Sequence, residues 1–497
     1  MMKNSLIKAT LTVSFLSVIT RVLSFLFRIY LSRTIGAENL GIYQIALSVF
    51  FLFATLTSGL SLTLSRKTAE LYAVGCEKEQ KSFVSSALII GLSISAFIIA
   101  VFYAFSGSFS FLFSEERCLP LFLVLLPSTL STTAYGIIRG WFWGRKNFSL
   151  FALTEFFECV IRIGLGVIFI SGICMGIKGA YGTALSFTLS DYICTGILLI
   201  LFFIHGGRFG RPSGYKSTIK TALPLTAVRV YNSLINSLIA IIVPAMLVKS
   251  GLSTSHAMSE YGRAMGMAMP LLLSPLTLTG SISTVLVPEL ATLNAQNNVI
   301  QLKRKIESSL MLSIFCACIF MALFIPLGEN IGLLFYNDEK SGFYISMTAI
   351  IMLPMSINNV SSTILDSCGF ELKTMKNYVI GSLFCLVSMI ALPLFIGTYA
   401  IAVGLGLSYL ITGFLNCKTL KKAIGFSFKN LFNKTLVECV TVGVCAYGAT
   451  FIKNLLFAFP NIVQITIPAI FVCVFFILIN SLYGYVNVAH FYKKSRN

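Results

Sequence analysis

The sequence predicts an all-α integral membrane protein with 14 transmembrane helices, in two parallel six-helix repeats followed by two C-terminal helices. Hydrophobic residues make up 56% of the 497 residues and charged residues only 11%, whereas a soluble chain is about 25% charged. The mean hydropathy is +0.87. Fourteen apolar runs are each about 20 residues long, enough to cross about 30 Å of hydrocarbon as helix.

The apolar runs give the bounds of the expected spans. They lie near residues 6–32, 41–64, 83–106, 119–138, 150–173, 179–204, 219–248, 261–287, 307–327, 343–366, 377–396, 398–416, 435–456 and 462–488. Lys3 and Lys8 precede the first run, as in a signal peptide. That run is too long for a signal peptide, contains arginines and has no small-residue cleavage site, so we interpret it as a span.

The two halves of the chain resemble each other. The stretch GAYGTALSFTLSDYI from Gly179 matches GTYAIAVGLGLSYLI from Gly397, and Pro127 in the fourth span aligns with Pro354 in the tenth. Chance similarity between apolar helices is the alternative. Because six is an even number, both halves begin on the same side of the membrane. Parallel repeats of this kind have a transport site at their interface.

This repeat predicts four parts of the chain. They are an N-terminal six-helix lobe at 1–204, a cytoplasmic linker at 205–218, a C-terminal six-helix lobe at 219–417, and helices 13 and 14 with a cytoplasmic tail at 418–497. The linker lies in the stretch HGGRFGRPSGYKSTIK, which is rich in glycine and cations.

Basic residues in the connections predict the orientation. Of the 37 lysines and arginines, 26 fall on the side of the N-terminus and 7 on the other side. Basic residues accumulate in cytoplasmic loops, so both termini are predicted to be cytoplasmic in a multi-pass protein of the cell membrane. The net charge of +19 is spread over eight segments rather than one soluble domain. That distribution argues against nucleic acid as a partner.

Charged residues inside the spans predict a site. Arg21 and Arg28 are seven residues apart, so they share one helix face about 10 Å apart. A charge at the centre of a span costs about 2.5 to 3.5 kcal/mol. Two interpretations remain open: ion pairs inside the protein, or an anion-facing cavity. The candidates for charge pairing or ion coupling are Glu155, Glu158, Arg162 and Asp191. Arg162 follows Glu158 by four residues, a spacing that favours a local pair.

An anion that suits several arginines is a pyrophosphate. Guanidinium groups donate paired hydrogen bonds to phosphate oxygens, and a pyrophosphate offsets two or three positive charges. Arg229 and Arg263 would approach from the second half. The predicted substrate-binding residues are therefore Arg21, Arg28, Arg229 and Arg263.

At these residues the sequence resembles a known family. ITRVLSFLFRIYLSRTIGAENLGIYQ closely resembles the first span and following loop of SpoVB-type sporulation proteins. These belong to the polysaccharide-exporter branch of the superfamily (MOP) that also holds the MurJ lipid II flippases and the multidrug and toxin extruders. TSGLSLTLSRKTAE, ECVIR and YGRAMGMAMPLLLSPLTLTGSISTVLVPELA look like the second, fifth and eighth spans of the same family. The likeness covers essentially the whole chain.

The resemblance implies a flippase with two six-helix lobes around a cationic cavity. Its substrate would be a polyprenyl-pyrophosphate-linked saccharide, such as a lipid II-like precursor of cell-wall or spore-cortex peptidoglycan or another polysaccharide unit. Alternating access would carry it from the cytoplasmic to the outer leaflet. Arg21 and Arg263 match cavity arginines of MurJ by similarity. The second first-span arginine of MurJ falls at Phe27, and Arg28 fits the SpoVB-type pattern instead. In MurJ-like proteins helices 13 and 14 form a groove for the polyprenyl tail. Here they include IPAIFVCVFFILIN, which suits either such a groove or an ordinary lipid-facing surface.

The sequence lacks the motifs that other functions would require. No GxxxxGK[ST] motif occurs, so ATP is not the expected driver. Three histidines lie far apart, and 13 cysteines form no CxxC pattern, so no metal or other cofactor is expected. A drug or cation antiporter of the same superfamily would favour an acidic cavity and lack helices 13 and 14. A membrane glycosyltransferase or ligase would need catalytic groups on a large outer loop. We expect a non-enzymatic transporter that acts as a monomer.

Overall fold

A computed structural model describes residues 2–171, 179–276, 290, 292–293, 296 and 298–482. Helices dominate, and no strand occurs among these residues. Ten of the helices in these ranges are long and apolar enough to cross a membrane, or eleven with one bent pair counted as a span. The predicted all-α, multi-pass membrane fold is confirmed, and the number of fourteen spans stays a prediction.

The helices form two compact units, which divide after Gly262. The linker at 205–218 does not coincide with this division. The helix that follows it, α8 (Tyr215–Lys249), packs against α1, α2 and α3 of the first unit. The predicted seventh span thus groups with the first six, and the lobe bounds derived from the repeat remain a prediction.

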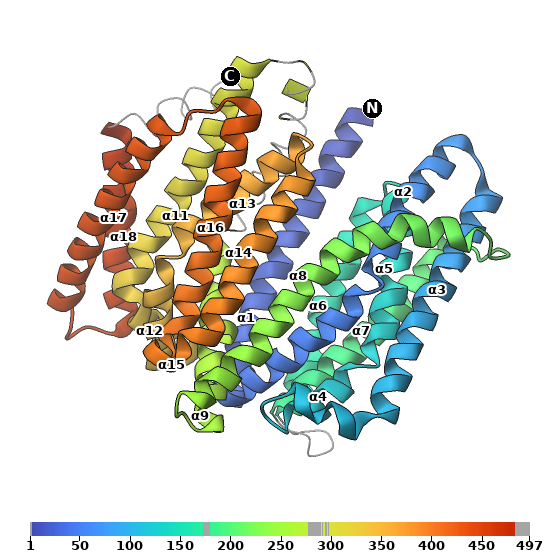
Figure 1. The fold of residues 1–497 in the computed structure, drawn as a ribbon, viewed down its shortest axis with the longest axis horizontal. Coiled ribbons are helices and arrows are strands. Elements are labelled where there is room, and N and C mark those ends of the chain that lie inside the picture. The colour runs from blue at the N-terminus through green and yellow to red at the C-terminus, as the bar shows by residue number, and fades with distance from the viewer. Residues whose placement is uncertain are drawn as a thin grey trace. The chain divides into compact units, whose positions relative to one another are not determined.

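The first unit contains nine α-helices and one 3-10 helix in its described part. They are α1 (Met2–Thr55), α2 (Ser58–Val74), α3 (Glu77–Ala104), η1 (Ser106–Leu112), α4 (Cys118–Leu125), α5 (Ser128–Gly144), α6 (Phe148–Ile170), α7 (Ala180–Ile204), α8 and α9 (Thr254–Tyr261). Figure 1 shows this part of the chain in blue to green.

The long element α1 contains two helical segments rather than one. Gly36, between them, has φ 77° and ψ 170°, a backbone conformation that side chains with a Cβ rarely adopt. In Figure 1 the chain descends from the N-terminus and then turns back toward α2. Gly36 lies between the predicted spans at 6–32 and 41–64. The gap between these two spans therefore agrees with the break at Gly36 inside α1.

Two predicted spans are interrupted inside the first unit. The run at 41–64 is broken between α1 and α2, and the run at 119–138 is broken between α4 and α5 at Pro127. Buried hydroxyl groups gather near the first break, at Thr57: Thr133 Oγ1 lies 2.7 Å from Thr57 Oγ1 and 2.9 Å from Ser95 Oγ. Broken helices are tolerated at membrane depth when neighbouring polar groups satisfy the backbone.

The second unit begins in a π-helix. Its described elements are η2 (the π-helix Gly262–Ala268), α11 (Val299–Tyr336), α12 (Glu339–Ala349), α13 (Met352–Ser367), α14 (Glu371–Ala391), α15 (Pro393–Ile396), α16 (Tyr399–Ile424), α17 (Lys429–Leu455) and α18 (Asn461–Leu482). Residues 277–287 of the predicted eighth span lie outside the described residues, as do the last residues of the fifth and fourteenth.

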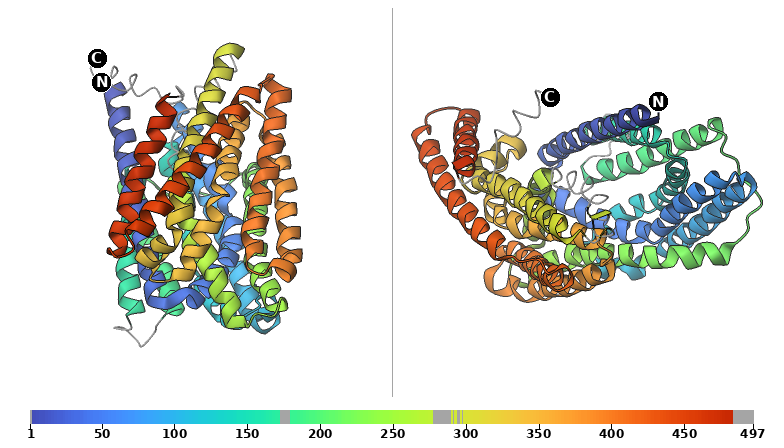
Figure 2. Two further views of the ribbon diagram at one scale, coloured as in Figure 1. Left: turned by 90° about the vertical axis from the view of Figure 1, so that its left-hand side faces the viewer. Right: turned by 90° about the horizontal axis from the view of Figure 1, so that it is seen from above.

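Helices α17 and α18 correspond to the predicted spans 13 and 14. They pack against each other and against α11, and Figure 2 shows them in red beside the yellow α11. Polar contacts join α11 to α17 near one end of this group and α11 to α18 near the other end. Lys434 donates to Glu307 Oε1 at 2.8 Å, and Asn330 Nδ2 donates to Asn461 Oδ1 at 2.7 Å.

Candidate functional site

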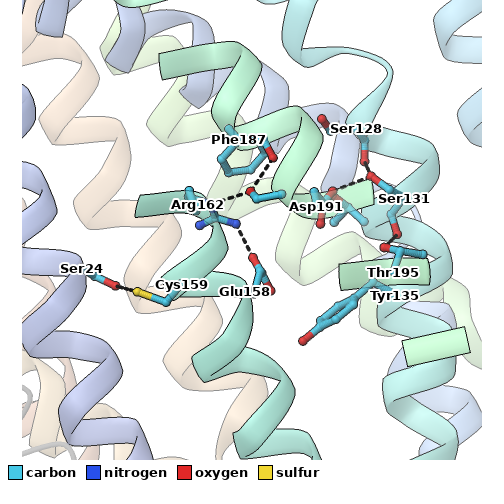
Figure 3. Close-up of polar contacts among 12 residues, drawn as sticks. Ser24, Ser128, Ser131, Tyr135, Glu158, Cys159, Arg162, Phe187, Asp191 and Thr195 are labelled. Carbon is cyan, nitrogen blue, oxygen red and sulfur yellow. Dashed lines mark hydrogen bonds and ion pairs between the residues drawn. The ribbon is translucent and has the colours of Figure 1, made fainter. Parts of the chain in front are cut away.

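The arginine-bearing face of α1 lies against α6. Ser24 Oγ is 3.4 Å from Cys159 Sγ, and the Cys159 thiol also donates to the Thr20 carbonyl oxygen over 3.8 Å. Arg21 and Arg28 stand three residues before and four residues after Ser24, and residues at these spacings share one side of a helix. Both arginines therefore lie on the side of α1 that carries Ser24, whose contact with Cys159 on α6 is drawn in Figure 3.

Helix α6 carries a matching row of charged residues. Glu155 lies four residues before Cys159 and Arg162 three residues after it, and Glu158 is its neighbour in the sequence. Arg162 donates a hydrogen bond to Glu158 Oε1 and another, 3.3 Å long, to Ser190 Oγ (Figure 3). Its guanidinium carbon also lies 4.5 Å from the centre of the Phe187 ring. These contacts hold Arg162 in place and give Glu158 a local partner.

Glu155 is surrounded by arginines. Its charge interacts electrostatically with Arg139 on α5 and with Arg21 on α1. Within the described ranges, Arg21 forms no ion pair with Glu155, Glu158 or Asp191. The choice between ion pairs inside the protein and an anion-facing cavity therefore stays open, since Glu155 lies near Arg21 without an ion pair between them.

Arg28 lies near the other end of the same row. Arg28 and Arg162 both interact electrostatically with the hydroxyl group of Tyr43, which is buried. Arg21 and Arg28 follow each other along α1, and Glu155 and Arg162 follow each other along the neighbouring α6. We call these charged residues, together with Glu158, the charged strip.

Asp191 on α7 is bound by hydroxyl groups rather than by an arginine. The hydroxyls of Ser131 and Thr132 on α5 donate to Asp191 Oδ2 at 2.6 and 2.7 Å. Asp191 is 5% exposed. Because α7 packs against both α5 and α6, this carboxylate lies near the Glu158–Arg162 pair, to its right in Figure 3.

Arg229 lies in the same unit as these residues. It projects from α8, is exposed, and its Nη1 donates to the Ser58 carbonyl oxygen over 3.5 Å. It also interacts electrostatically with Arg139. The sequence predicted that Arg229 approaches from the second half, but the structure places α8 in the first unit because α8 packs against α1, α2 and α3.

Arg263 belongs to the second unit. Its Nε donates to both oxygens of Asp338, at 2.9 and 3.2 Å. Asp338 is also the N-cap of α12, since its Oδ1 accepts a hydrogen bond from the Ser341 N–H at 3.0 Å. Both side chains are mostly buried, so Arg263 has a protein carboxylate where the sequence predicted a substrate anion.

Sequence reasoning missed several members of the site. The predicted fourth span ended at residue 138, but α5 continues to Gly144 and places Arg139 half-buried beside Glu155. The spacing of Tyr135, Arg139 and Trp143 on one helix face could have indicated this. No local signal links Asp338 to Arg263, which are 75 residues apart. Within the described residues, no cluster of three or more His, Cys, Asp or Glu side chains could hold a metal ion.

Comparisons with known proteins identify relatives. A family model described as "Polysaccharide biosynthesis protein" matches residues 6–294. Stage V sporulation protein B of Bacillus subtilis (strain 168) is 24% identical over 471 residues, which cover 91% of this chain and 90% of that protein. Sporulation protein YkvU of the same organism is 18% identical over 354 residues, which cover 69% of this chain and 78% of YkvU.

Solved structures show the same fold. The structure titled "Lipid II flippase MurJ, inward closed conformation" has a TM-score of 0.74 and 17% identity, covering 94% of this chain and 98% of that one. The inward-facing structure of a multidrug resistance MATE family transporter of the MOP superfamily has a TM-score of 0.70 and 14% identity, covering 84% and 98%. At these identities the likeness concerns the fold alone.

Proposed function

Because the chain belongs to the polysaccharide biosynthesis protein family, we propose that it is a flippase for a polyprenyl-pyrophosphate-linked saccharide. It would move this lipid from the cytoplasmic to the outer leaflet by alternating access. The relatives named Stage V sporulation protein B and Lipid II flippase MurJ support a precursor of peptidoglycan, for the cell wall or the spore cortex, as the cargo. The protein acts as a transporter, without chemistry on the saccharide.

One observation carries this proposal: the charged strip between α1 and α6 has an excess of positive charge. The strip and its neighbours in the first unit comprise five arginines and three carboxylates, namely Arg21, Arg28, Arg139, Arg162, Arg229, Glu155, Glu158 and Asp191. Their formal charges sum to +2, and positive charge within membrane spans is costly unless an anion approaches. A pyrophosphate supplies that anion.

The residues of the strip have different roles. Arg21 is exposed and makes no hydrogen bond or ion pair with a residue in the described ranges, so its guanidinium is available to a ligand. Arg28, on the same helix face, is its partner in binding the pyrophosphate, and Arg229 adds a third positive charge. Arg162 is held by Glu158, Ser190 and Phe187, and so serves to position the strip.

Two further groups have conditional roles. Arg263 becomes a substrate ligand in a conformation in which Asp338 releases it, because the Arg263 Nε donates to Asp338 here. Glu155 and Asp191 are the carboxylates to which a coupling ion would bind, since neither has an ion-pair partner within the described ranges. A proton or a sodium ion would lower the negative charge beside the arginines and so change the affinity for the anion.

Binding of a polyprenyl pyrophosphate to the purified protein in nanodiscs tests the proposal. Arg21→Ala should lower the affinity tenfold or more, since a hydrogen bond to a charged group contributes about 1.5 to 3 kcal/mol. Arg21→Lys should restore part of it, because lysine keeps the charge but not the paired donors. Arg33→Ala is the matched control, because Arg33 lies on the same helix and is exposed near its end.

The amount of folded protein must be measured on the same samples. If Arg21→Ala is folded and binds the lipid as tightly as the wild type, the strip is not the pyrophosphate site. A multidrug resistance transporter shares this fold, but a positive strip would repel organic cations. Binding of tetraphenylphosphonium by the wild type, in place of the pyrophosphate lipid, would favour that alternative.

A further inference from the structure

A buried polar pair joins α17 to α18. Glu438 on α17 and Asn480 on α18 are each 1% exposed. Asn480 Nδ2 donates one hydrogen bond to Glu438 Oε2 at 3.3 Å and another to the Phe476 carbonyl oxygen at 3.0 Å. Both N–H groups of the amide are therefore in use.

The remaining two oxygens of this pair lack partners. Among the described residues, nothing donates a hydrogen bond to Glu438 Oε1 or to Asn480 Oδ1, and both atoms are buried. An ionised carboxylate can only accept hydrogen bonds, and so can an amide oxygen. The pair thus contains two unused acceptors and no unused donor. Leaving buried acceptors unsatisfied is unfavourable, more so when one of them carries a charge.

The surroundings offer no cation to balance an ionised Glu438. The titratable groups that interact with its charge are thiols: Cys318 on α11, and Cys439 and Cys445 on α17 itself. On α18 the group facing it is the Asn480 amide. No lysine or arginine in the described ranges interacts with Glu438, and Lys434, one turn earlier, donates instead to Glu307.

We propose that Glu438 is a proton-binding site, at which the neutral carboxyl group and the Asn480 amide form a closed pair of hydrogen bonds. Oε1–H donates to Asn480 Oδ1, while Asn480 Nδ2 donates to Oε2. A single proton from water converts the carboxylate to the acid, and no other group changes. This one proton supplies the missing donor, satisfies both unused acceptors and removes the buried charge.

The site lies outside the two predicted six-helix repeats and does not depend on the identity of the cargo. Its hydrogen bonds join the two C-terminal helices through two side chains that are buried, so water does not compete for these bonds. The folded protein holds a proton that the unfolded chain releases at neutral pH. The unfolded state therefore binds fewer protons, and stability falls as the pH rises.

Infrared spectroscopy and thermal unfolding of the purified protein test the proposal together. The wild type at neutral pH should show the carbonyl absorption of a neutral carboxylic acid, and Glu438→Gln should remove that absorption. Glu438→Gln should also unfold at the wild-type temperature or above, because the glutamine amide can donate to Asn480 Oδ1. Its unfolding temperature should fall less with rising pH than that of the wild type.

Two further variants serve as comparisons. Glu307→Gln changes a glutamate that contacts the same helix but has Lys434 and Asn430 as partners, so the acid absorption should persist. Asn480→Leu removes both partners of the carboxyl group and should lower the unfolding temperature. The proposal is overturned if Glu438→Gln retains the acid absorption of the wild type. It is equally overturned if that variant unfolds well below the wild type at neutral pH, since Glu438 would then act as a carboxylate.

Discussion

The hydroxyl oxygen of Ser24 lies 3.4 Å from the sulfur of Cys159. This contact fixes how α1 and α6 are aligned along their length. Arg21 then falls beside Glu155, and Arg28 falls toward the Arg162 end of α6. The charged strip is thus a consequence of one alignment between two helices, and each residue of the strip can be altered separately.

The alignment of α1 and α6 can be tested by forming a disulfide bond. Ser24→Cys should cross-link to Cys159 under mild oxidation, because the two side-chain atoms are already close and a disulfide requires about 2 Å between sulfurs. Val22→Cys is the control, since Val22 is 52% exposed and projects from another side of α1. Mass spectrometry of the digested protein identifies the linked peptides. A link from residue 22 in place of residue 24 would contradict the alignment.

The two hydroxyl donors to Asp191 lead to a prediction about stability. Asp191→Ala should leave the Thr132 hydroxyl without its acceptor and lower the free energy of unfolding by about 1 to 3 kcal/mol. Asp191→Asn keeps an acceptor oxygen and should cost much less. Thermal unfolding of both variants in the same detergent distinguishes them. Equal losses would mean that the charge of Asp191, rather than its hydrogen bonds, stabilises the unit.

Asp338 both pairs with Arg263 and caps α12, and substitutions can separate these two interactions. Asp338→Ser keeps an oxygen that caps α12 but loses the ion pair with Arg263, whereas Asp338→Ala loses both. The alanine variant should therefore be less stable than the serine variant by about 1 kcal/mol. A double-mutant cycle with Arg263→Ala should give a coupling of about 0.5 to 3 kcal/mol. A coupling of zero would show that the ion pair contributes nothing to stability.

A close crossing of α1 with the end of α9 requires glycine. A Cβ atom at Gly262 would lie 2.0 Å from the Ala37 carbonyl oxygen, and one at Gly41 would lie 2.2 Å from that of Met258. Gly262→Ala should therefore destabilise the protein by about 1 to 3 kcal/mol or prevent its folding. Gly196→Ala, where a Cβ would meet nothing within 4 Å, should be neutral or slightly stabilising. Yield and unfolding temperature report the difference.

Composition and local spacing predicted the features that depend on neighbours in the sequence. The apolar runs indicated the all-α membrane fold, since each helix must satisfy its own backbone in lipid. The spacing of Glu158 and Arg162 pointed to a local pair, and Arg162 donates to Glu158 in the structure. Both inferences need only the geometry of a single helix.

Features that depend on the packing of distant segments could not be predicted in this way. Asp191 finds Ser131 and Thr132, about 60 residues away, because α5 and α7 happen to pack together. The α5 helix continues beyond the apolar run because Trp141 and Phe142 are buried against other helices. Arg139 consequently joins the site instead of a loop, and sequence hydropathy has no information about that burial.

The π-helix at Gly262–Ala268 has a consequence for the side chains on either side of it. Its hydrogen bonds span five residues instead of four, so one extra residue is accommodated within the turn. The Tyr336 hydroxyl donates to the Met267 carbonyl oxygen at 2.9 Å within this stretch. Deleting one residue here would restore α-helical phase and rotate Arg263 by about 100° relative to the residues after Ala268. The direction of the Arg263 side chain therefore depends on the number of residues in this stretch as well as on the hydrogen bonds that the side chain makes.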